Sequence, residues 1–388
     1  NSLVVESIII TKELKPKFFI FENVMRFLTT ICTDVDGVDK PIKEAIENNL
    51  AGQYQIHYQV VNFKNYGSPS SRTRTLVIGV NKELKEITPL DIMPEYRPEV
   101  TLRQVIGHLP SLKEMDEIDP KDIYHSFRRY KPEMREWIKD LKEGESAFDN
   151  TDPRKIPHQV KNGEIVINQN KNGDKYKRQE WDKVAPCVHT RNDILASQNT
   201  IHPADDRVFS IRELMLMMSI PDSFKWADIS FEELNSYSRE MKMKFLKENE
   251  LNIRHAIGEA VPTQVFAEIA GNIKNVLENE VLNKRNVDAI INKYELSDEE
   301  NLKRFIKENP CNYDYKNLFK IAELANSRRI DNSAYYTRQD ICYSILKDLP
   351  SAEEYSNKKE LRILEPSVGV GNFIPLLVKK YGSLKKVR

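Results

Sequence analysis

The segment Phe18-Phe-Ile-Phe-Glu-Asn-Val24 combines an apolar run with a carboxylate at its end. Four apolar residues followed by Glu22 and Asn23 are typical of a buried strand that stops at a turn. Because ligands of α/β proteins bind beyond the carboxyl ends of strands, Glu22 is a candidate site residue. Taken alone, the sequence Glu-Asn-Val is also typical of a turn or a helix cap.

Helix and strand patterns alternate around this segment. Residues 1–14 and 24–51 predict helices, the second one interrupted around 34–37. Residues 57–62 and 75–80 predict strands, separated by turn-forming residues. We therefore expect an α/β fold in which helices cover a sheet.

The sequence changes character between residues 91 and 206. This region is rich in Pro, Asn, Asp and Lys and has only short apolar runs, such as 165–167. Residues 170–173 have the composition of a hairpin turn. A smaller, irregular domain with exposed loops is expected here.

Helical patterns return after this region. Ser210 is expected to cap a helix over 210–218, with Glu213 as its capping-box partner, and 262–276 predict a helix that Pro262 opens. The charged residues 277–329, with a helix start at Ser297-Asp-Glu-Glu, predict a helical connector. The expected parts are residues 1–90, 91–206, 207–275, 276–330 and 331–388.

Composition sets few limits on function. Lys plus Arg and Asp plus Glu both number 59 among the 388 residues, so net charge gives no indication of nucleic-acid binding. No run of about 18 apolar residues occurs, and no signal peptide is recognisable, so we expect no membrane span. The four cysteines show no metal-binding spacing, which favours a reduced, cytoplasmic protein without a metal site.

One segment concentrates basic and aromatic residues. Arg128 and Arg129 belong to residues 124–139, where Lys and Arg alternate with Tyr, Phe and Trp. Such a surface is suited to contacts with phosphate groups. A solvated helix face is the alternative.

Four further blocks carry recognisable chemistry. Arg72 and Arg74 lie two residues apart in an extended segment, so both side chains can point to one face. The remaining blocks are His202-Pro-Ala-Asp-Asp-Arg207, Phe209-Ser-Ile-Arg-Glu-Leu214 with Ile220-Pro-Asp-Ser-Phe224, and Ile257-Gly-Glu-Ala-Val-Pro262.

In this order and with these gaps, the blocks resemble the later motifs of the DNA cytosine-5 methyltransferases, over residues 1–275. Residues 15–24 are similar to that family's ENV block, and 66–79 to its paired-arginine block. Residues 207–224 and 257–273 are similar to its penultimate and final motifs.

The resemblance implies a partial Rossmann-like sheet and methyl transfer from S-adenosylmethionine to C5 of a cytosine flipped out of double-stranded DNA. Glu22 would hydrogen-bond the ring N3 and the exocyclic amine of cytosine. Arg74, supported by Arg72, would hold the carbonyl edge of the base.

The same resemblance makes residues 91–206 the target recognition domain, whose loops read bases in the major groove. Arg207 and Arg212 would position that domain or contact phosphate. The cofactor would lie beside Glu259, Ala260 and Val261.

Some positions depart from the family pattern. Ser70 stands where the family has Gln, and Glu259 stands where it has Asn. Leu216, Met218 and Ser219 replace its usual Arg, Gln and Gly. These departures concern details of DNA and cofactor contact.

Two family blocks are not among these residues: a glycine-rich cofactor loop and a Pro-Cys nucleophile loop, both of which precede the ENV block. Cys187 follows a proline, but it lies in the segment that would close the recognition domain, so we expect it to be structural. We therefore expect no methyl transfer by this chain alone, and a partner chain that supplies both loops.

The end of the sequence carries a second resemblance. A predicted strand at 361–364, a glycine-bearing loop and a helix at 374–380 follow the motif Ala334-Tyr-Tyr-Thr337. This arrangement resembles the start of an N6-adenine DNA methyltransferase, in which Asn372 would cap the helix. The implied cofactor-binding residues are Tyr336, Thr337, Glu365, Gly369 and Gly371. An unrelated nucleotide-binding fold is the alternative.

The expected function is thus the C-terminal part of a DNA cytosine-5 methyltransferase of a restriction-modification system, joined to the start of an adenine-type enzyme. A non-catalytic DNA-binding or specificity module that needs a partner chain is the alternative. Methylation of tRNA cytosine is a third reading, against which the size of the recognition region argues.

Overall fold

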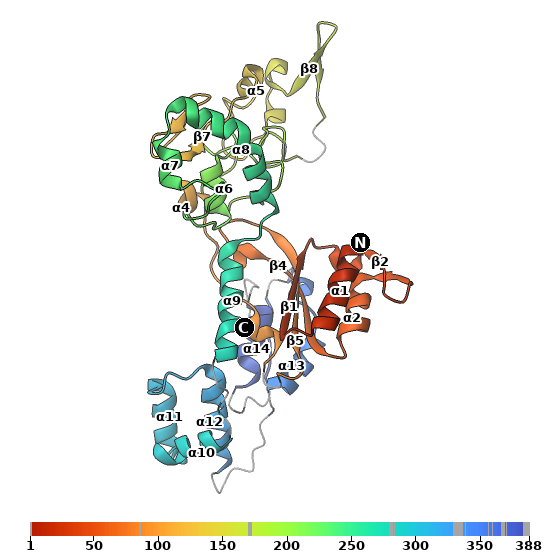
Figure 1. The fold of residues 1–388 in the computed structure, drawn as a ribbon, viewed down its shortest axis with the longest axis vertical. Helices are drawn as coiled ribbons and strands as arrows, with labels where there is room; N and C mark the ends of the chain where they lie inside the picture. The colour runs from red at the N-terminus through yellow and green to blue at the C-terminus, as the bar shows by residue number, and fades with distance from the viewer. Residues whose placement is uncertain are drawn as a thin grey trace. The chain divides into compact units, whose positions relative to one another are not determined.

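The computed structural model describes two compact units (Figure 1). We call residues Asn1–Val61, Arg74–Tyr96 and Glu268–Arg388 the sheet unit, and Asn62–Thr73 and Arg97–Ala267 the loop-rich unit. The described residues are 2–84, 87–169, 173–278, 282, 284–328, 337, 339–355, 357–358, 360–365, 369 and 371–382.

A three-stranded sheet of order β1-β5-β4 forms the centre of the sheet unit. It consists of β1 (Phe18–Asn23), β5 (Thr73–Asn81) and β4 (Tyr54–Asn62), and β1 runs antiparallel to β5 with Glu22 opposite Leu76. The middle strand β5 is apolar and almost entirely buried, as a strand covered on both faces requires. The strands predicted near 18–21, 57–62 and 75–80 are confirmed.

Two helices, α1 (Ser2–Leu14) and α2 (Ile42–Leu50), lie side by side next to β1 (Figure 1). Their apolar faces share a core with the strands, which includes Ile8, Ile46 and Phe19. Burying side chains of this size contributes about 1.5–3 kcal/mol each.

The predicted helix over 24–51 is wrong in its first half. A hairpin of β2 (Ile31–Thr33) and β3 (Asp39–Pro41) precedes α2. Gly37 takes a φ of 79° in the connecting turn, and Pro41 stands immediately before the helix. Because proline disrupts a helix interior, α2 starts only after it.

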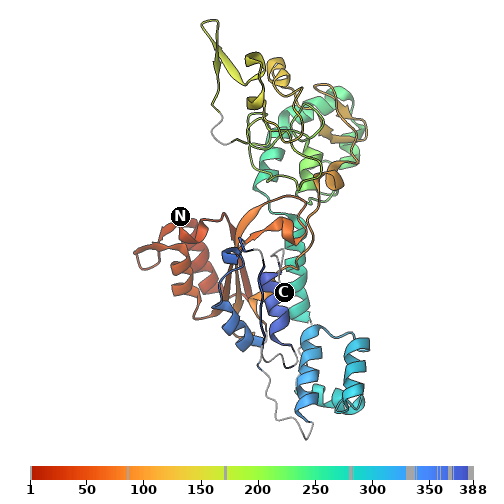
Figure 2. The ribbon, with the colours of Figure 1, turned by 180° about the vertical axis from the view of Figure 1, so that it is seen from behind.

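The remaining sheet-unit elements are mostly helices. They are α3 (Pro89–Ile92), the end of α9 (Thr263–Glu278), α10 (Lys284–Lys293), α11 (Glu299–Glu308), α12 (Tyr315–Ser327), α13 (Gln339–Lys347), η5 (Glu353–Tyr355) and α14 (Phe373–Tyr381), besides η1 (Phe27–Thr29) after β1. Helices α13 and α14 are neighbours, as Figure 2 shows from behind.

Three predictions for this region have different outcomes. The helix start at Ser297 is confirmed, because the side chain of Asp298 accepts a 2.9 Å hydrogen bond from the backbone N–H of Asn301. The strand predicted at 361–364 is wrong, because the described residues there form at most a single bridge. Residues 374–380 are helical, as predicted.

The loop-rich unit contains short elements and one long helix. They are η2 (Phe63–Tyr66), α4 (Leu102–Ile106), β6 (Ile118–Asp119), β7 (Asp122–Ser126), α5 (Pro132–Glu136), η3 (Ala147–Asp149), η4 (Pro153–Lys155), β8 (His158–Lys161), β9 (Glu164–Ile167), α6 (Ile211–Met217), α7 (Phe231–Ser236) and α8 (Arg239–Glu259). Its largest core packs α6 and α8 with β7, through residues such as Leu214, Ile257 and Ile123.

The local sequence patterns in this unit predicted one feature correctly, whereas the hairpin that the structure describes lies elsewhere than predicted. The capping box of α6 is confirmed: Ser210 accepts from Glu213 N–H at 3.2 Å, and Ser210 N–H donates to Glu213 Oε2 at 2.7 Å. The hairpin turn predicted at 170–173 falls mostly outside the described residues. The described hairpin turns earlier, at Asn162-Gly163.

Candidate active site

Glu22 and Arg74 form an ion pair in the sheet unit. Glu22 lies at the end of β1 opposite Leu76, so Arg74 is its diagonal neighbour on the same face. Arg74 Nε lies 3.2 Å from Glu22 Oε1, and the side chains are 18% and 19% exposed. The sheet therefore holds a carboxylate and a guanidinium together while leaving both accessible.

Hydrogen bonds fix the chain immediately after Glu22. Asn23 Oδ1 accepts from the N–H of Val24 at 2.9 Å, and the hydroxyl of Thr75 donates to the carbonyls of Val24 and Met25, each at 3.2 Å. The turn or cap considered for Asn23 is thus present. It holds the end of β1 in place through hydrogen bonds that do not involve the Glu22 carboxylate.

Arg72 occupies a buried position in the loop-rich unit. Its Nη1 donates to the carbonyl oxygens of Val188 and Gly258, at 3.1 and 3.3 Å, and the residue is 4% exposed. These bonds tie the segment before β5 to the end of α8. The sequence analysis predicted that Arg72 supports Arg74. The hydrogen bonds of Arg72 within the loop-rich unit instead position the backbone at Val188 and Gly258.

The end of α8 carries the predicted cofactor residues. Ala260 is the C-cap, Glu259 is 65% exposed beside His255 at 3.6 Å, and Val261 is half-buried. A Cβ on Gly258 would lie 2.5 Å from the backbone of His189, so only glycine fits there. Glu259, Ala260 and Val261 therefore follow a tightly packed junction and are open to solvent.

Arg207 lies in an enclosed ionic network. Its side chain is 1% exposed, and its guanidinium bonds Glu213 at 2.7 and 2.8 Å and Asp205 at 2.9 Å. Burial opposes ionisation of Glu213, yet the charge and hydrogen bonds of Arg207 hold the pKa of that carboxyl below its ordinary value. Of the two roles predicted for Arg207, positioning fits this geometry, and phosphate contact does not.

His202 completes this network. Its Nδ1 accepts the backbone N–H of Asp205 at 2.9 Å, and its Nε2 lies 3.5 Å from Glu213 Oε1. Burial lowers the pKa of His202 to about 4. The sequence analysis quoted these residues in two neighbouring blocks, 202–207 and 209–214, but it did not indicate that they contact one another.

Arg212 is also held inside the loop-rich unit. Its side chain is 6% exposed and forms ion pairs with Asp122 and Asp222. Its guanidinium lies 5.2 Å from the ring centre of Phe231, within the range of cation–π attraction. Arg212 thus positions α6 against β7, and the predicted phosphate contact does not fit this burial.

Arg128 and Arg129 are more accessible. Arg129 is 73% exposed and pairs with Asp116, whereas Arg128 is 25% exposed and bonds Glu250 at 2.8 Å. Both line a groove of about 600 Å³ together with Lys244 and Lys247 of α8. Asp116, Glu117 and Glu250 also line this groove, and the phosphate-contacting surface stays a prediction.

The C-terminal motifs can be followed in part. Tyr336 lies outside the described residues, and Glu365 is half-buried. Gly369 and Gly371 take φ values of 52° and 88°, which favour glycine. The side-chain amide of Asn372 donates to the carbonyl oxygen of Thr337 at 2.8 Å and forms no helix cap, so the capping role predicted for it is wrong.

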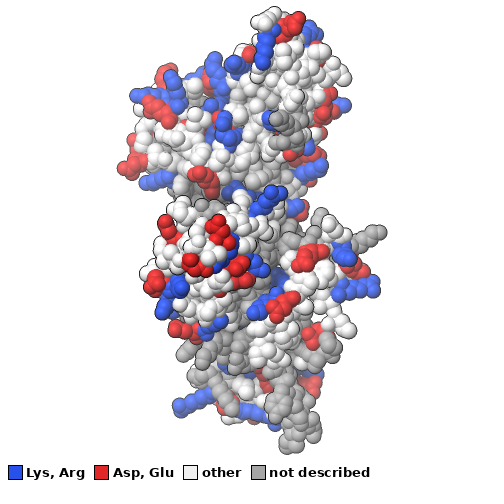
Figure 3. All heavy atoms as spheres, turned by 90° about the vertical axis from the view of Figure 1, so that its right-hand side faces the viewer, with Lys and Arg blue, Asp and Glu red and all other residues white. Residues whose placement is uncertain are grey.

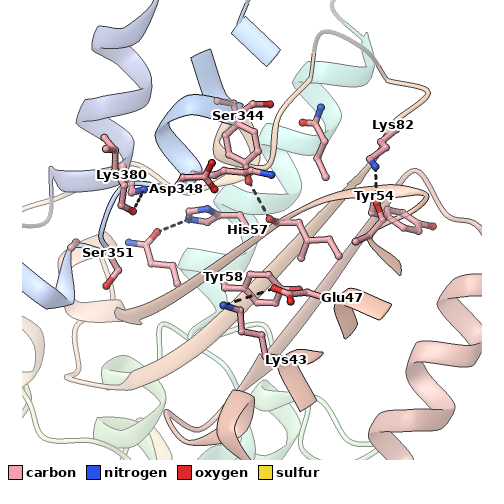
Figure 4. Close-up of a pocket in the computed structure, with 18 residues that line it drawn as sticks. Lys43, Glu47, Tyr54, His57, Tyr58, Lys82, Ser344, Asp348, Ser351 and Lys380 are labelled. Atoms are coloured by element: carbon pink, nitrogen blue, oxygen red, sulfur yellow. Dashed lines mark hydrogen bonds and ion pairs between the residues drawn. The ribbon is translucent and has the colours of Figure 1, made fainter. Parts of the chain in front are cut away.

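A pocket of about 660 Å³ lies beside β4 and α13 (Figure 4). Burial lowers the pKa of His57 in its wall to about 4. Tyr343 donates to the carbonyl of Ile56 at 3.3 Å, and Lys380 donates to that of Leu349 at 2.8 Å. The described residues that line it include none of the predicted site residues, and the fold itself uses these polar groups.

Lys and Arg alternate with Asp and Glu over the face drawn in Figure 3. Within the described ranges, no group of three or more His, Cys, Asp or Glu residues could hold a metal ion. In the same part of the chain, every helix is too short or too polar to cross a membrane.

Comparison with known proteins identifies the class. Residues 1–275 match the family of C-5 cytosine-specific DNA methylases. The type II methyltransferase M1.HgaI of Avibacterium volantium is 31% identical over 286 residues, which cover 71% of this chain and 71% of that protein. The chain therefore belongs to the C-5 cytosine-specific DNA methylase family, whose methyl donor is S-adenosylmethionine.

Other similarities are weaker. The type II methylase M.HgiDII of Herpetosiphon aurantiacus is 28% identical over 239 residues, covering 58% of this chain and 57% of that protein. A crystal structure of a DNA modification methyltransferase encoded within an E. coli prophage has a TM-score of 0.46 and 18% identity, covering 72% of this chain and 74% of that one.

Proposed function

We propose that this chain takes part in methylation of cytosine C5 in double-stranded DNA and supplies the groups that hold the target base. The observation that carries the proposal is the Glu22–Arg74 pair, 3.2 Å apart and accessible at the end of β1. A cytosine presents a ring nitrogen, an amine and a carbonyl along one edge, and the duplex conceals this edge unless the base is flipped out.

Each member of the pair has a distinct role. The carboxyl group of Glu22 hydrogen-bonds ring N3 and the exocyclic amine, which draws electron density from the ring and makes C6 open to attack. Arg74 donates to the carbonyl oxygen of the base while keeping Glu22 oriented. Arg72 acts indirectly, by donating hydrogen bonds to the backbone carbonyl oxygens of Val188 and Gly258.

The residues at the end of α8 fit a nucleoside cofactor. The exposed carboxylate of Glu259 is an acceptor for hydroxyl groups, and Ala260 and Val261 present half-buried apolar surface beside it. When bound, S-adenosylmethionine supplies a methyl group on a positively charged sulfur. The loop-rich unit contacts the DNA, with Arg128 and Arg129 on phosphate groups.

The nucleophile comes from sequence other than these 388 residues. Burial raises the pKa of the Cys32 thiol, which disfavours a thiolate. Cys187 lies 3.7 Å from the carbonyl oxygen of Val188, beside the backbone that Arg72 holds. Since neither thiol is placed as a nucleophile, we propose that a further segment or a partner chain provides the Pro-Cys and glycine-rich loops of the family.

Methyl transfer tests this function. The chain is mixed with a polypeptide that carries those two loops, and tritiated methyl from S-adenosylmethionine is followed into duplex DNA. We expect incorporation at cytosine C5, and a loss of roughly 10²–10⁴-fold for Glu22→Gln. The matched variant Glu13→Gln, on the exposed side of α1, keeps full activity.

Three results would contradict parts of this proposal. Activity of the 388 residues alone would show that they contain the nucleophile. Duplex binding without incorporation in the mixture would favour the non-catalytic specificity module. Full activity of Glu22→Gln would remove Glu22 from the mechanism.

A second activity, at adenine N6, is supported by one contact. Asn372 bonds the Thr337 carbonyl at 2.8 Å, which brings the two predicted cofactor motifs of the C-terminal segment together. We propose that this segment begins an adenine-type methyltransferase. In a restriction-modification system, a fused cytosine and adenine methyltransferase would suit an asymmetric DNA site, whose two strands present different bases. Nucleoside analysis of the labelled DNA separates 5-methylcytosine from N6-methyladenine and so tests the two activities independently.

A further inference from the structure

The pocket of about 660 Å³ in the sheet unit is a groove along the free edge of β4. Within the described residues β4 pairs with β5 on one side only, so it is an edge strand, nine residues long. Six consecutive residues of this strand, 54–59, line the groove. A long strand edge is a template on which another extended chain can pair, and β4 contains none of the lysines or prolines that usually block such an edge.

The backbone groups of every second residue in β4 face away from β5. The carbonyl of Gln53 accepts from the N–H of Lys82, which directly follows β5, at 2.9 Å. Because alternate residues of an antiparallel strand bond the same neighbour, the odd-numbered residues of β4 face β5, and the even-numbered residues direct their N–H and C=O groups outward. In agreement, the carbonyl of Ile56 accepts from the hydroxyl of Tyr343 in α13 at 3.3 Å. This distance is long for a hydroxyl donor, so an incoming N–H can replace it.

The groove lies between α2 and α13 (Figure 4). Neighbouring side chains of a strand point to opposite faces of the sheet. The ring of Tyr58 lies toward α2, with Lys43 Nζ 5.4 Å from its centre. On the other face, the ring of His57 lies 6.3 Å from that of Tyr343 in α13. The strand edge between these faces is the floor of the groove and the two helices are its walls, which is the arrangement that admits one more strand.

Positive charge predominates around the groove. Its lining contains four lysines and two carboxylates, namely Lys43, Lys82, Lys347 and Lys380 against Glu47 and Asp348. Each carboxylate has a lysine beside it: Glu47 lies 3.8 Å from Lys43, and the charge of Asp348 acts on Lys380. The other two ammonium groups have no carboxylate within 4 Å in the part of the chain that the structure describes. An extended segment with acidic side chains is therefore complementary to the floor and to the charge around it.

We propose that this groove binds an extended acidic peptide segment of a partner protein, which pairs with β4 as an additional strand and places carboxylates near Lys82 and Lys347. Backbone groups of the segment bond those of the even-numbered residues of β4, and the carbonyl of Ile56 exchanges the hydroxyl of Tyr343 for a backbone N–H. This interaction goes beyond the proposed function, because it requires neither DNA nor S-adenosylmethionine.

Fluorescence anisotropy with the full chain tests the interaction. The probe is a short labelled peptide in which glutamate and valine alternate, and the control peptide has the same sequence with its backbone nitrogens methylated. Methylation keeps the charge and removes the N–H donors, so we expect roughly tenfold weaker binding or more. Amide hydrogen exchange, followed by mass spectrometry, should slow at residues 54–58 when the first peptide is added and stay unchanged with the second.

Three variants locate the binding site. Lys82→Gln and Lys347→Gln should each weaken binding of the first peptide roughly two- to fivefold, since exposed ion pairs contribute modestly. Tyr343→Phe removes the hydroxyl that occupies the carbonyl of Ile56, and we expect it to bind the peptide at least as tightly as the unaltered chain. The matched control is Lys303→Gln, an exposed lysine on α11, which should bind like the unaltered chain.

Several outcomes would overturn the proposal. Equal binding of the two peptides would show an anion site without strand pairing. Absence of binding, or unchanged exchange at β4 while the first peptide binds, would remove the groove as its site. A concentration-dependent dimer that protects β4 and resists the peptide would place a second copy of the chain in the groove instead. Methyl transfer is measured with DNA and without peptide, so the proposed function stands or falls separately.

Discussion

The guanidinium of Arg207 lies between two carboxylates, those of Asp205 and Glu213, and is 1% exposed. The resemblance left two roles open for Arg207, positioning of the recognition domain or contact with phosphate, and its surroundings favour positioning. A charge enclosed this fully is stabilised only by its partners, and removing one partner leaves the others buried and unpaired. Arg207 therefore fixes the chain that leads into α6.

The same network makes the stability of the loop-rich unit depend on pH through His202. Burial lowers the pKa of His202 to about 4, whereas an unfolded histidine titrates near 6.5. The unfolded chain therefore binds a proton first as pH falls. Stability from this residue is complete above about 6.5 and is lost progressively toward pH 4, by roughly 3 kcal/mol.

Urea unfolding of the chain and of His202→Asn, measured between pH 7 and pH 4, checks this expectation. Asparagine retains an acceptor for the backbone N–H of Asp205, which His202 Nδ1 provides. We expect the difference between the two proteins to shrink as pH falls. A difference independent of pH would show that His202 is not kept neutral by burial.

Among the secondary-structure elements, the sequence predicted those whose signals are local. Strands β1 and β5 follow from their apolar runs, and α6 from its capping box. The β2–β3 hairpin was missed because its strands have three residues each, too few for an alternating pattern, and of β2 only Cys32 is buried in the core. Helix α8 was missed because most of its residues are polar and only a few, such as Phe245 and Ile253, are buried apolar residues that mark a helix face.

The candidate site was predictable to the same extent. Glu22 ends β1, as the apolar run before it predicted, whereas the pairing of Arg74 with Glu22 from the adjacent strand could not be read from the sequence. The partners of Arg72, Arg207 and Arg212 are backbone carbonyls or carboxylates from other elements. No spacing rule indicates such partners, and for this reason positioning could not be separated from phosphate contact.

The junction of α8 with the chain at His189 yields a prediction for a single glycine. A Cβ on Gly258 would lie 2.5 Å from the backbone carbon of His189 and the nitrogen of Thr190. Because backbone cannot yield as a side chain can, we expect Gly258→Ala to lower the free energy of unfolding by roughly 1–3 kcal/mol. Gly258 also accepts a bond from Arg72, so duplex binding should weaken as well.

Gly271→Ala is the matched control. Gly271 lies inside α9, and nothing lies within 4 Å of the position its Cβ would take. There alanine removes the entropic cost of glycine in a helix, and we expect stability unchanged or higher by up to about 1 kcal/mol. Equal changes in thermal unfolding for both variants would refute the close contact at Gly258.

At the scale of the whole chain, Asp91 connects segments that the sequence assigned to different domains. It is the N3 residue of α3, where it accepts from Thr88. The hydroxyl of Tyr315 and the ammonium of Lys316, both on α12, bond its carboxylate at 2.6 Å. The buried carboxylate of Asp91 thus links α12, one of the helices expected to form a connector, to α3.

We expect Lys316→Met to destabilise the sheet unit by about 3 kcal/mol, because it removes the ammonium group that forms an ion pair with the buried Asp91. Burial opposes ionisation of Asp91, and Lys316 holds the pKa of that carboxyl below its ordinary value. Without the lysine, burial dominates and the pKa rises. The stability lost should therefore be partly recovered as pH falls and Asp91 becomes protonated.

Thermal unfolding at several pH values, with limited proteolysis of α12, measures this effect. Lys303→Met on the exposed face of α11 is the control and should leave the unfolding temperature unchanged. Adding Asp91→Asn to Lys316→Met removes the unpaired charge, so the double variant should be more stable than the single one at neutral pH. If the double variant is the less stable, groups other than Lys316, such as the hydroxyl of Tyr315, stabilise the Asp91 carboxylate, and the prediction is wrong.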